Sequence, residues 1–372
     1  MMRPQPDTGA VTLLLATLRF PPADGVDAVS LAERWAAADS RGLAELIDFE
    51  GCALWLLRRL RQTGAHEVLD SPLGVSVAHA ARDIAARNLL IDAETEVVLR
   101  FFAARNVPCI LLKGAARRAL TDRFPFADAR PTQDLDVLVP LALAPAVWDD
   151  LRAAGYALLH PGRPARPYHH HQPGLLGPAG VAVEIHTSVA PGISAEKTWE
   201  RIRTTAMTVQ RFGAPTLVPS LTELLWDGTM HALRAAARGF RLHQMLAVAA
   251  IVAGAGVGGE EGLQEVRTRL ERNEGGEAPA AALASAWVEG AAWLAGLGPP
   301  APPASLCRAL HWRLALLRHV PMPQRMLTPL ADEASRLEFG LPPNRGHTSG
   351  FRPVGAALMR NAYRWWRVSH AS

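Results

Sequence analysis

Two aspartates one residue apart, Asp134 and Asp136, are the strongest chemical signal in the sequence. In a β-strand, residues i and i+2 point to the same side, so the spacing predicts that both carboxylates face one site while Leu135 and Val137 line the buried face. Two convergent carboxylates suit a hard cation such as Mg²⁺ that is bound together with substrate phosphates. The other acid-x-acid pairs of the chain fall in helical patterns, where i and i+2 do not face each other. A metal site is one interpretation of the pair, and a solvated strand edge is the other.

A third carboxylate, Glu184, lies in a second strand pattern at residues 181–186. The alternation of this strand places Ala182, Glu184 and His186 on one face. If the strand neighbours that of Asp134, three carboxylates converge as they do in two-metal phosphoryl-transfer sites. Taken alone, Glu184 also fits an exposed strand residue, and His186 either contacts a nucleotide or hydrogen-bonds Glu184.

A turn with a single glycine precedes the aspartates. The apolar run at residues 109–112 has strand length, and Lys113, Gly114 and Ala115 follow it at the start of a predicted helix. A glycine between a strand and a helix lets the backbone approach a phosphate, and a helix start favours anions. The turn is not a Walker A loop, which needs more glycines and a Lys-Ser/Thr pair. A lone glycine most often marks only a turn. It supports a phosphate site here because it lies shortly before Asp134.

Taken together, three strings resemble one protein family. They are Leu-Leu-Lys-Gly-Ala-Ala at 111–116, Arg-Pro-Thr-Gln-Asp-Leu-Asp-Val-Leu-Val at 130–139 and Val-Glu-Ile-His at 183–186. In this order and spacing they are similar to the uncharacterised nucleotidyltransferase family of the DNA polymerase β-like superfamily. The resemblance extends more loosely over residues 40–295, where residues 219–223 and His231 echo the helical part that follows the core.

The resemblance implies a metal-dependent transfer reaction. Asp134, Asp136 and Glu184 would be the catalytic residues and would hold Mg²⁺, or Mn²⁺ in its place, and Glu184 would help to deprotonate an acceptor hydroxyl. A nucleoside monophosphate would move from a nucleoside triphosphate, ATP foremost, to a hydroxyl or phosphate of an acceptor, with release of pyrophosphate. A small molecule, a peptide and a protein all remain open as the acceptor.

The resemblance also implies a nucleotide-binding set. Gly114 and Ala115 would approach the triphosphate, and His186 would contact the nucleotide. Lys113 and Arg130 are phosphate contacts on grounds of charge. The chain departs from the superfamily where Ala115 replaces a usual serine and Thr187 replaces a usual aromatic residue.

Other functions stay open beside this one. A catalytically silent nucleotide-binding, regulatory or scaffold protein could retain the fold, and a scaffold should bind no nucleotide when Mg²⁺ is present. A metal-dependent hydrolase could use the histidines at 169–171, which are otherwise a surface loop or a nucleotide contact. The C-terminal arginines Arg360, Arg364 and Arg367 share one helical face, which is either a solvated surface or a binding surface.

The composition of the chain excludes several other classes of protein. The chain has 372 residues, a net charge of +4, 49% hydrophobic residues and 20% charged residues. These values exclude a disordered chain, and the absence of a basic stripe beside the core argues against long nucleic acid as a partner. The three cysteines predict no disulfide framework and a reducing compartment. With no apolar run of membrane-spanning length and no signal peptide pattern, we expect a cytoplasmic protein.

The elements that must position these residues form an α+β protein with a small mixed sheet. Residues 1–105 read as helices, 106–212 as the nucleotidyltransferase core and 213–372 as a second helical region with a proline-rich connector near 297–304. Within the core, the predicted strands lie near residues 109–112, 134–139, 156–159, 181–186 and 207–211. Helices are expected at 115–120 and 144–154, and a polar loop at 160–180.

Overall fold

A computed structural model describes residues 8–20, 28–38, 40–161, 170–189, 193–236, 241–272, 274 and 281–319. The chain forms two compact units. One unit comprises Met1–Ala81, Thr229–Ala249 and Pro279–Ser372, and the other comprises Arg82–Gly228 and Ala250–Ala278. The predicted division into three consecutive regions stays a prediction. His169 and the arginines of residues 360–367 lie outside the described residues.

The second unit contains a five-stranded mixed sheet of order β1-β2-β5-β4-β3. Its strands are β1 (Ile110–Leu111), β2 (Asp134–Leu138), β3 (Ala157–Leu158), β4 (Leu175–Leu176) and β5 (Ala182–His186). β2 and β5 run parallel, and every other neighbouring pair of this sheet is antiparallel. The predicted α+β fold with a small mixed sheet is therefore confirmed.

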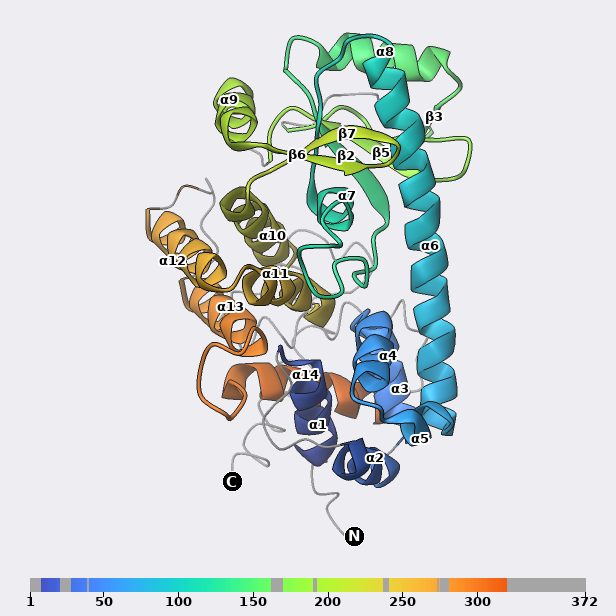
Figure 1. Cartoon of the computed structure of the whole chain (residues 1–372), viewed down its shortest axis with the longest axis vertical. Helices are drawn as coiled ribbons and strands as arrows, with labels where there is room; N and C mark the ends of the chain where they lie inside the picture. Colours follow the sequence, from blue (N-terminus) through green and yellow to red (C-terminus); the bar gives the residue numbers. More distant parts are fainter. Residues whose placement is uncertain are drawn as a thin grey trace, which may run out of the picture. The chain divides into compact units, whose positions relative to one another are not determined.

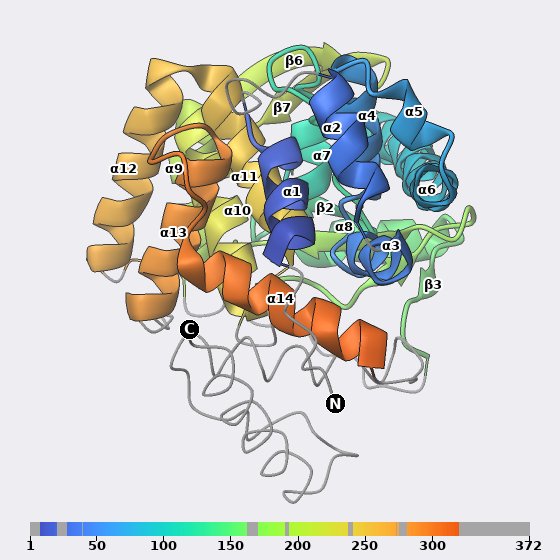
Figure 2. The same ribbon diagram turned by 90° about the horizontal axis from the view of Figure 1, so that it is seen from below.

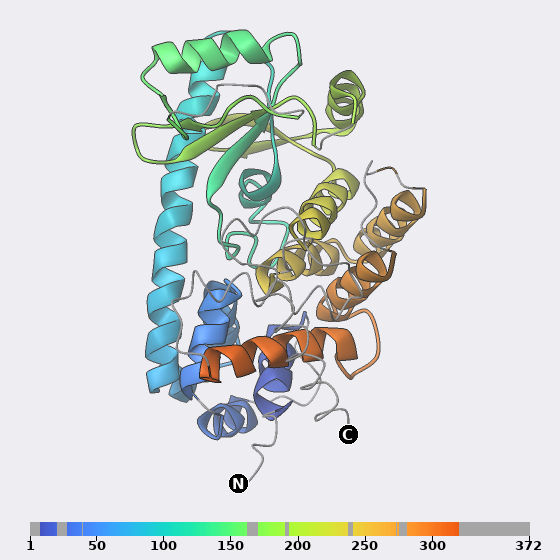
Figure 3. The ribbon, with the colours of Figure 1, turned by 180° about the vertical axis from the view of Figure 1, so that it is seen from behind.

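Burial explains why the two central strands form where they do. Leu135 and Val137 of β2 and Val183 and Ile185 of β5 are all buried, as the alternation of the sequence predicts. The helices of this unit include α7 (Lys113–Arg118), α8 (Ala144–Ala153) and α9 (Ala195–Thr205). A core cluster joins β1, the end of β2 and α9 through Ile110, Leu112, Leu138, Val189 and Ile202. Figure 3 shows α7 lying against the sheet.

Two short strands were not predicted from the sequence. β4 lies inside the expected polar loop, and its two residues are too few to show a period. β6 (Met207–Arg211) and β7 (Ala214–Val218) form a separate hairpin, of which only β6 was expected. The turn between them has positive φ at Phe212 (54°) and Gly213 (74°), as a type I′ turn requires. Phe-Gly is an unusual pair for such a turn, and the hairpin therefore had no recognisable signal in the sequence.

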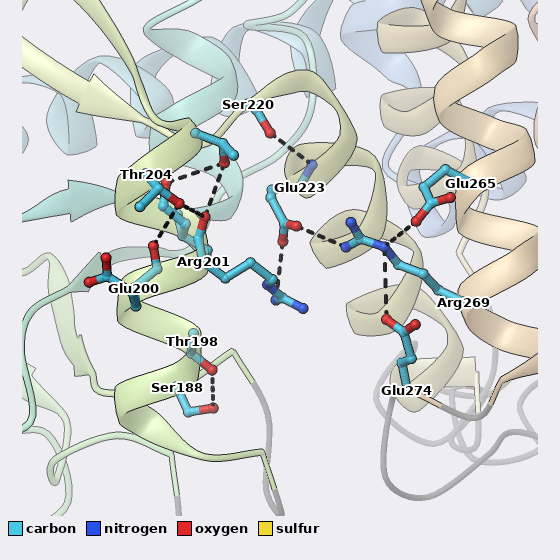
Figure 4. A network of polar contacts seen from close by, with 12 residues as sticks. Ser188, Thr198, Glu200, Arg201, Thr204, Ser220, Glu223, Glu265, Arg269 and Glu274 are labelled. Carbon is cyan, nitrogen blue, oxygen red and sulfur yellow. Dashed lines mark hydrogen bonds and ion pairs between the residues drawn. The ribbon is translucent and has the colours of Figure 1, made fainter.

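An ion-pair network connects two of the remaining helices of the second unit to α9. α10 (Leu221–Ala236), α11 (Leu242–Ala255) and α12 (Val257–Glu271) follow the hairpin, and the unit boundaries fall inside α10 and α11. Figure 4 shows the buried Glu223 of α10 between two arginines, Arg201 of α9 at 3.1 Å and Arg269 of α12 at 2.8 Å. Arg269 also pairs with Glu265. One carboxylate thus connects three helices of this unit.

The first unit is helical. It contains α1 (Thr8–Leu18), α2 (Ala28–Ala36), α3 (Ser40–Phe49), α4 (Ala53–Gln62), α5 (His66–Leu69), α13 (Ala281–Leu294), α14 (Ala304–His319) and the first part of α6 (Pro72–Ala103). Figure 2 shows α14 passing beside α1 and α3. Among the described residues, no helix is both long and apolar enough to cross a membrane. The three cysteines form no disulfide.

A buried ion pair lies inside this first unit. Arg313 of α14 donates to Glu50, which directly follows α3, and both residues are 0% exposed. The second carboxylate oxygen of Glu50 accepts the backbone N–H of Leu242 at 2.7 Å, and its main-chain carbonyl accepts the N–H of His243 at 3.2 Å. Glu50 therefore connects three segments that are far apart in the sequence.

Candidate active site

The parallel pairing of β2 and β5 brings carboxylates from both strands together. Asp136 lies opposite Glu184 in the register, and Leu138 lies opposite His186. One ligand atom each from Asp136, Glu184 and His186 fall within 4.8 Å of one another. The two strands are therefore neighbours in the sheet, as expected (Figure 1). Two carboxylates and an imidazole at this spacing can hold a divalent cation.

Two cationic side chains contact Asp136, which is 1% exposed. The ammonium of Lys113 lies 2.6 Å from Asp136 Oδ1, and Nε2 of His186 lies 2.7 Å from the same oxygen. Lys113 has a positive φ of 46°, an uncommon conformation for a residue other than glycine. The turn between β1 and α7 therefore places the lysine against the carboxylate at some cost in backbone strain.

His186 is surrounded by hydrogen-bond acceptors. Its Nε2 donates to Asp136 Oδ1 and lies 3.3 Å from Glu184 Oε2, while its Nδ1 faces the carbonyl of Ser188 at 3.3 Å. Carboxylates and carbonyls only accept, so these contacts require hydrogen on both ring nitrogens, and Nε2 would have to lose its hydrogen before it could bind a cation. Burial and Lys113 lower the pKa of His186, but the hydrogen bonds to the two carboxylates outweigh them and raise it to about 9.

The pKa values of the two aspartates of the motif are shifted in opposite directions. Burial alone would raise the pKa of Asp136, but the charge of Lys113 and the hydrogen bond from His186 hold it far below its usual range. Asp134 has no such partner, and the charge of Asp136 together with burial raises its pKa to about 6. Asp134 shares the face of Asp136 but stands outside the three-residue group, in which His186 joins the two carboxylates.

The predicted glycine turn packs closely against the segment before β2. A Cβ at Gly114 would lie 2.5 Å from Cγ2 and 2.7 Å from Oγ1 of Thr132, so a larger residue would require the buried Thr132 to shift. Ala115 is buried, and its methyl group therefore belongs to the core. The structure thus gives this glycine a packing role beside the predicted approach to a phosphate.

The histidines of the predicted polar loop lie beside the site. His171 forms a β-bridge with His186, and their rings are 5.2 Å apart between centroids. The ring of His170 lies 5.7 Å from that of His186. Burial lowers the pKa of His171. Among the described residues, neither His170 nor His171 joins the group of possible metal ligands, and their role stays a prediction.

Three residues near the site were missed by the reasoning from sequence. Asp227 of α10 is 5% exposed and makes no hydrogen bond or ion pair within the described part of the chain, and burial raises its pKa. It lies within electrostatic reach of Lys113 and Asp136. Arg117 and Asn88 are the other two. An acidic, basic or amide residue inside a helix is ordinarily solvated, so the sequence carried no signal for any of them.

Asn88 of α6 holds the segment that leads into β2. Its amide nitrogen donates to the carbonyls of Asp128 at 2.8 Å and Arg130 at 3.0 Å, and its oxygen accepts the N–H of Thr132 at 3.1 Å. Three hydrogen bonds from one buried side chain fix the backbone on both sides of Arg130. Asn88 therefore positions Arg130 and the start of the Asp134 strand.

We expect Asn88→Ala to destabilise the protein by about 2–3 kcal/mol, because it leaves buried backbone groups without partners. Urea unfolding followed by circular dichroism measures this loss. Asn88→Asp is the matched variant, since it keeps the shape and the acceptor but removes both donors. If Asn88→Ala unfolds at the wild-type urea concentration, Asn88 does not hold this segment.

A family model described as uncharacterised nucleotidyltransferase matches residues 36–272 of the chain. The match covers more than half of the 372 residues and includes all three motifs as well as the strands that carry them. No curated protein and no solved structure matches the chain. The parallel pair of acidic strands and this match agree, and the chain therefore belongs to the uncharacterised nucleotidyltransferase family.

Proposed function

We propose that the protein is a Mg²⁺-dependent nucleotidyltransferase that moves a nucleoside monophosphate from a nucleoside triphosphate, with ATP as the first candidate, to an acceptor. The observation that carries this proposal is the register of β2 and β5, which sets Asp136 opposite Glu184. Membership of the family supports nucleotidyl transfer as the class of reaction. Mn²⁺ is the natural substitute, because it accepts the same oxygen and imidazole ligands.

The three carboxylates would have different roles in the proposed reaction. An acceptor oxygen attacks the α-phosphorus, the bond from that phosphorus to the bridging oxygen breaks, and pyrophosphate leaves with the electron pair. A bound divalent cation neutralises charge on the phosphates during this step. Asp134, Asp136 and Glu184 would hold the cation. Glu184 would take the proton of the acceptor, because its side chain is 22% exposed while that of Asp136 is buried.

The positive groups around these carboxylates suit a polyphosphate. Lys113 lies against Asp136, and Arg130 lies within electrostatic reach of Asp134 and Asp136. In the proposed complex, both side chains would contact phosphate oxygens, while the carboxylates would hold the cation. Catalysis would then consist mainly of positioning and charge neutralisation.

A catalytically silent nucleotide-binding or scaffold protein is the alternative function. Such a protein commonly lacks one of the residues that hold the cation, whereas this chain retains all three predicted carboxylates. The identity of the acceptor, whether a small molecule, a peptide or a protein, is left open by the proposal.

Calorimetric titration with nucleoside triphosphates tests the proposal. We expect ATP or another triphosphate to bind in the presence of Mg²⁺, and we expect EDTA or the double substitution Asp134→Ala/Asp136→Ala to abolish binding. The matched control is Asp122→Ala/Asp149→Ala, which removes two exposed acidic residues and should leave binding unchanged. Absence of binding for every triphosphate would favour the scaffold function, and binding that resists both EDTA and the double substitution would refute the metal site.

A further inference from the structure

Arg117 of α7 is a buried arginine without a protein partner. The residue is 5% exposed, and its Nε is sealed from solvent with no hydrogen-bond acceptor. Its guanidinium makes no ion pair or hydrogen bond with any residue that the structure describes. Buried guanidinium groups normally have a carboxylate or another anion beside them, because desolvation of an unpaired charge costs several kcal/mol.

The next residue of the same helix shows what a structural arginine looks like here. Arg118 is equally buried, but its Nε lies 2.6 Å from Asp92 Oδ1 and one terminal nitrogen donates to Thr132 Oγ1 at 2.8 Å. Arg118 therefore ties α7 to α6 and to the segment before β2. Arg117 makes no comparable connection with the described residues, and the carboxylate that acts most on its charge, the buried Asp227 of α10, forms no ion pair with it.

A second arginine lies within electrostatic reach of Arg117. After burial, the charge of Arg130 is the largest influence that lowers the pKa of Arg117. The packing of Gly114 on Thr132 independently brings α7 against the segment that carries Arg130. Arg130 likewise makes no ion pair or hydrogen bond through its side chain with the described residues. Two like charges are thus held near each other, and no described carboxylate forms an ion pair with either, although Asp227 acts on both of them from farther away.

We propose that Arg117, together with Arg130, binds the pyrophosphate portion of the nucleoside triphosphate, an assignment that rests on the proposed function. Guanidinium groups bind phosphate oxygens through two parallel N–H donors and keep their charge when buried. The polyphosphate supplies the directly bound anion that both arginines lack among the described residues. The substrate is therefore a nucleoside triphosphate, selected through its leaving group, and inorganic pyrophosphate binds to the same place as the released product.

Titration with inorganic pyrophosphate, ATP and AMP, each with Mg²⁺, tests this assignment. We expect wild-type protein to bind pyrophosphate and ATP, and Arg117→Met to weaken both by about 10- to 100-fold, since a hydrogen-bonded charge contact is lost. AMP, which lacks the β- and γ-phosphates, should be bound equally by both proteins. Arg117→Lys should restore affinity in part, because it restores the charge without the forked donors. The exposed Arg123 provides the surface control, and Arg123→Met should match the wild type.

Thermal unfolding separates binding from a structural role. Arg117→Met should unfold at or above the wild-type temperature, because it removes a buried charge without a partner, whereas Arg118→Met should unfold earlier. Wild-type pyrophosphate affinity in Arg117→Met, or destabilisation as large as in Arg118→Met, would overturn the assignment. If Arg117→Met binds ATP and pyrophosphate normally while Asp134→Ala/Asp136→Ala does not, the nucleotidyltransferase proposal stands and only the role of Arg117 is wrong.

Discussion

Without metal, Asp136→Asn lowers the free energy of unfolding at neutral pH, whereas Asp134→Asn raises it. We expect a loss of about 3–5 kcal/mol for Asp136→Asn, because Lys113 and His186 lose their buried counter-ion. For Asp134→Asn we expect a gain of about 1–3 kcal/mol, because the substitution removes a carboxylate that the fold disfavours in its charged form. Two aspartates of one motif should thus respond in opposite directions.

The dependence on pH follows from the two pKa shifts. The pKa of Asp134 is raised to about 6 in the folded protein, so its penalty is absent below the unfolded pKa near 4 and complete above pH 6. The gain from Asp134→Asn should therefore appear as the pH rises from about 4 to 6. The pKa of Asp136 is depressed, so its stabilising effect is present above the unfolded pKa and is lost only as the solution becomes strongly acidic.

Urea unfolding in EDTA, at several values between pH 4 and pH 8, measures both effects. Asp149→Asn, at an exposed position of α8, should match the wild type at every pH. A destabilised Asp134→Asn at pH 8 would show that Asp134 has a stabilising partner in the folded protein, and the electrostatic contrast between the two aspartates would then be wrong.

Glu50→Ala should be the most destabilising single substitution in the helical unit, with a loss of about 3–5 kcal/mol. It leaves the guanidinium of Arg313 buried without its counter-ion and the N–H of Leu242 without an acceptor. Differential scanning calorimetry measures the loss as a lower unfolding temperature. Arg313→Met should destabilise the protein for the same reason, because it leaves the carboxylate buried instead.

The double variant Glu50→Leu/Arg313→Met tests whether the loss comes from the uncompensated charge. Replacing both partners of a buried ion pair with apolar residues is often neutral, so the double variant should be more stable than either single variant. The recovery should be incomplete, since Leu242 still lacks an acceptor for its N–H. Two single losses that simply add would mean that Glu50 and Arg313 act independently of each other.

The central strands could be predicted from the sequence because burial of one face of a strand produces an alternating pattern of apolar residues. Leu135 and Val137 alternate with Asp134 and Asp136, and this pattern specifies both the strand and the face that carries the carboxylates. To predict that Glu184 lies beside Asp136, one must also know that β2 and β5 pair in parallel. Pairing of strands that are far apart in the sequence leaves no local pattern, so here the resemblance to a family supplied what the spacing could not.

Other parts of the site had no local signal at all. The contact of His186 with Asp136 depends on the register across two strands, and the partners of Asn88 lie more than 35 residues further along the chain. Arg117 and Arg118 are identical in type and adjacent in sequence, yet of the two only Arg118 has an ion-pair or hydrogen-bond partner among the described residues. Such differences are set by tertiary packing, which one sequence read alone does not reveal.

One turn of α6 is hydrogen-bonded to the segments just before β2 and β5. Arg87 donates to the carbonyl of Gln133 at 2.9 Å, just before β2, and to that of Gly180 at 3.2 Å, shortly before β5. The adjacent Asn88 holds the same approach to β2. A displacement of this turn would therefore move the two strands together and keep the separation of Asp136 and Glu184 unchanged. The spacing of these two carboxylates is in this way set by the pairing of β2 with β5 and not by the position of the helix.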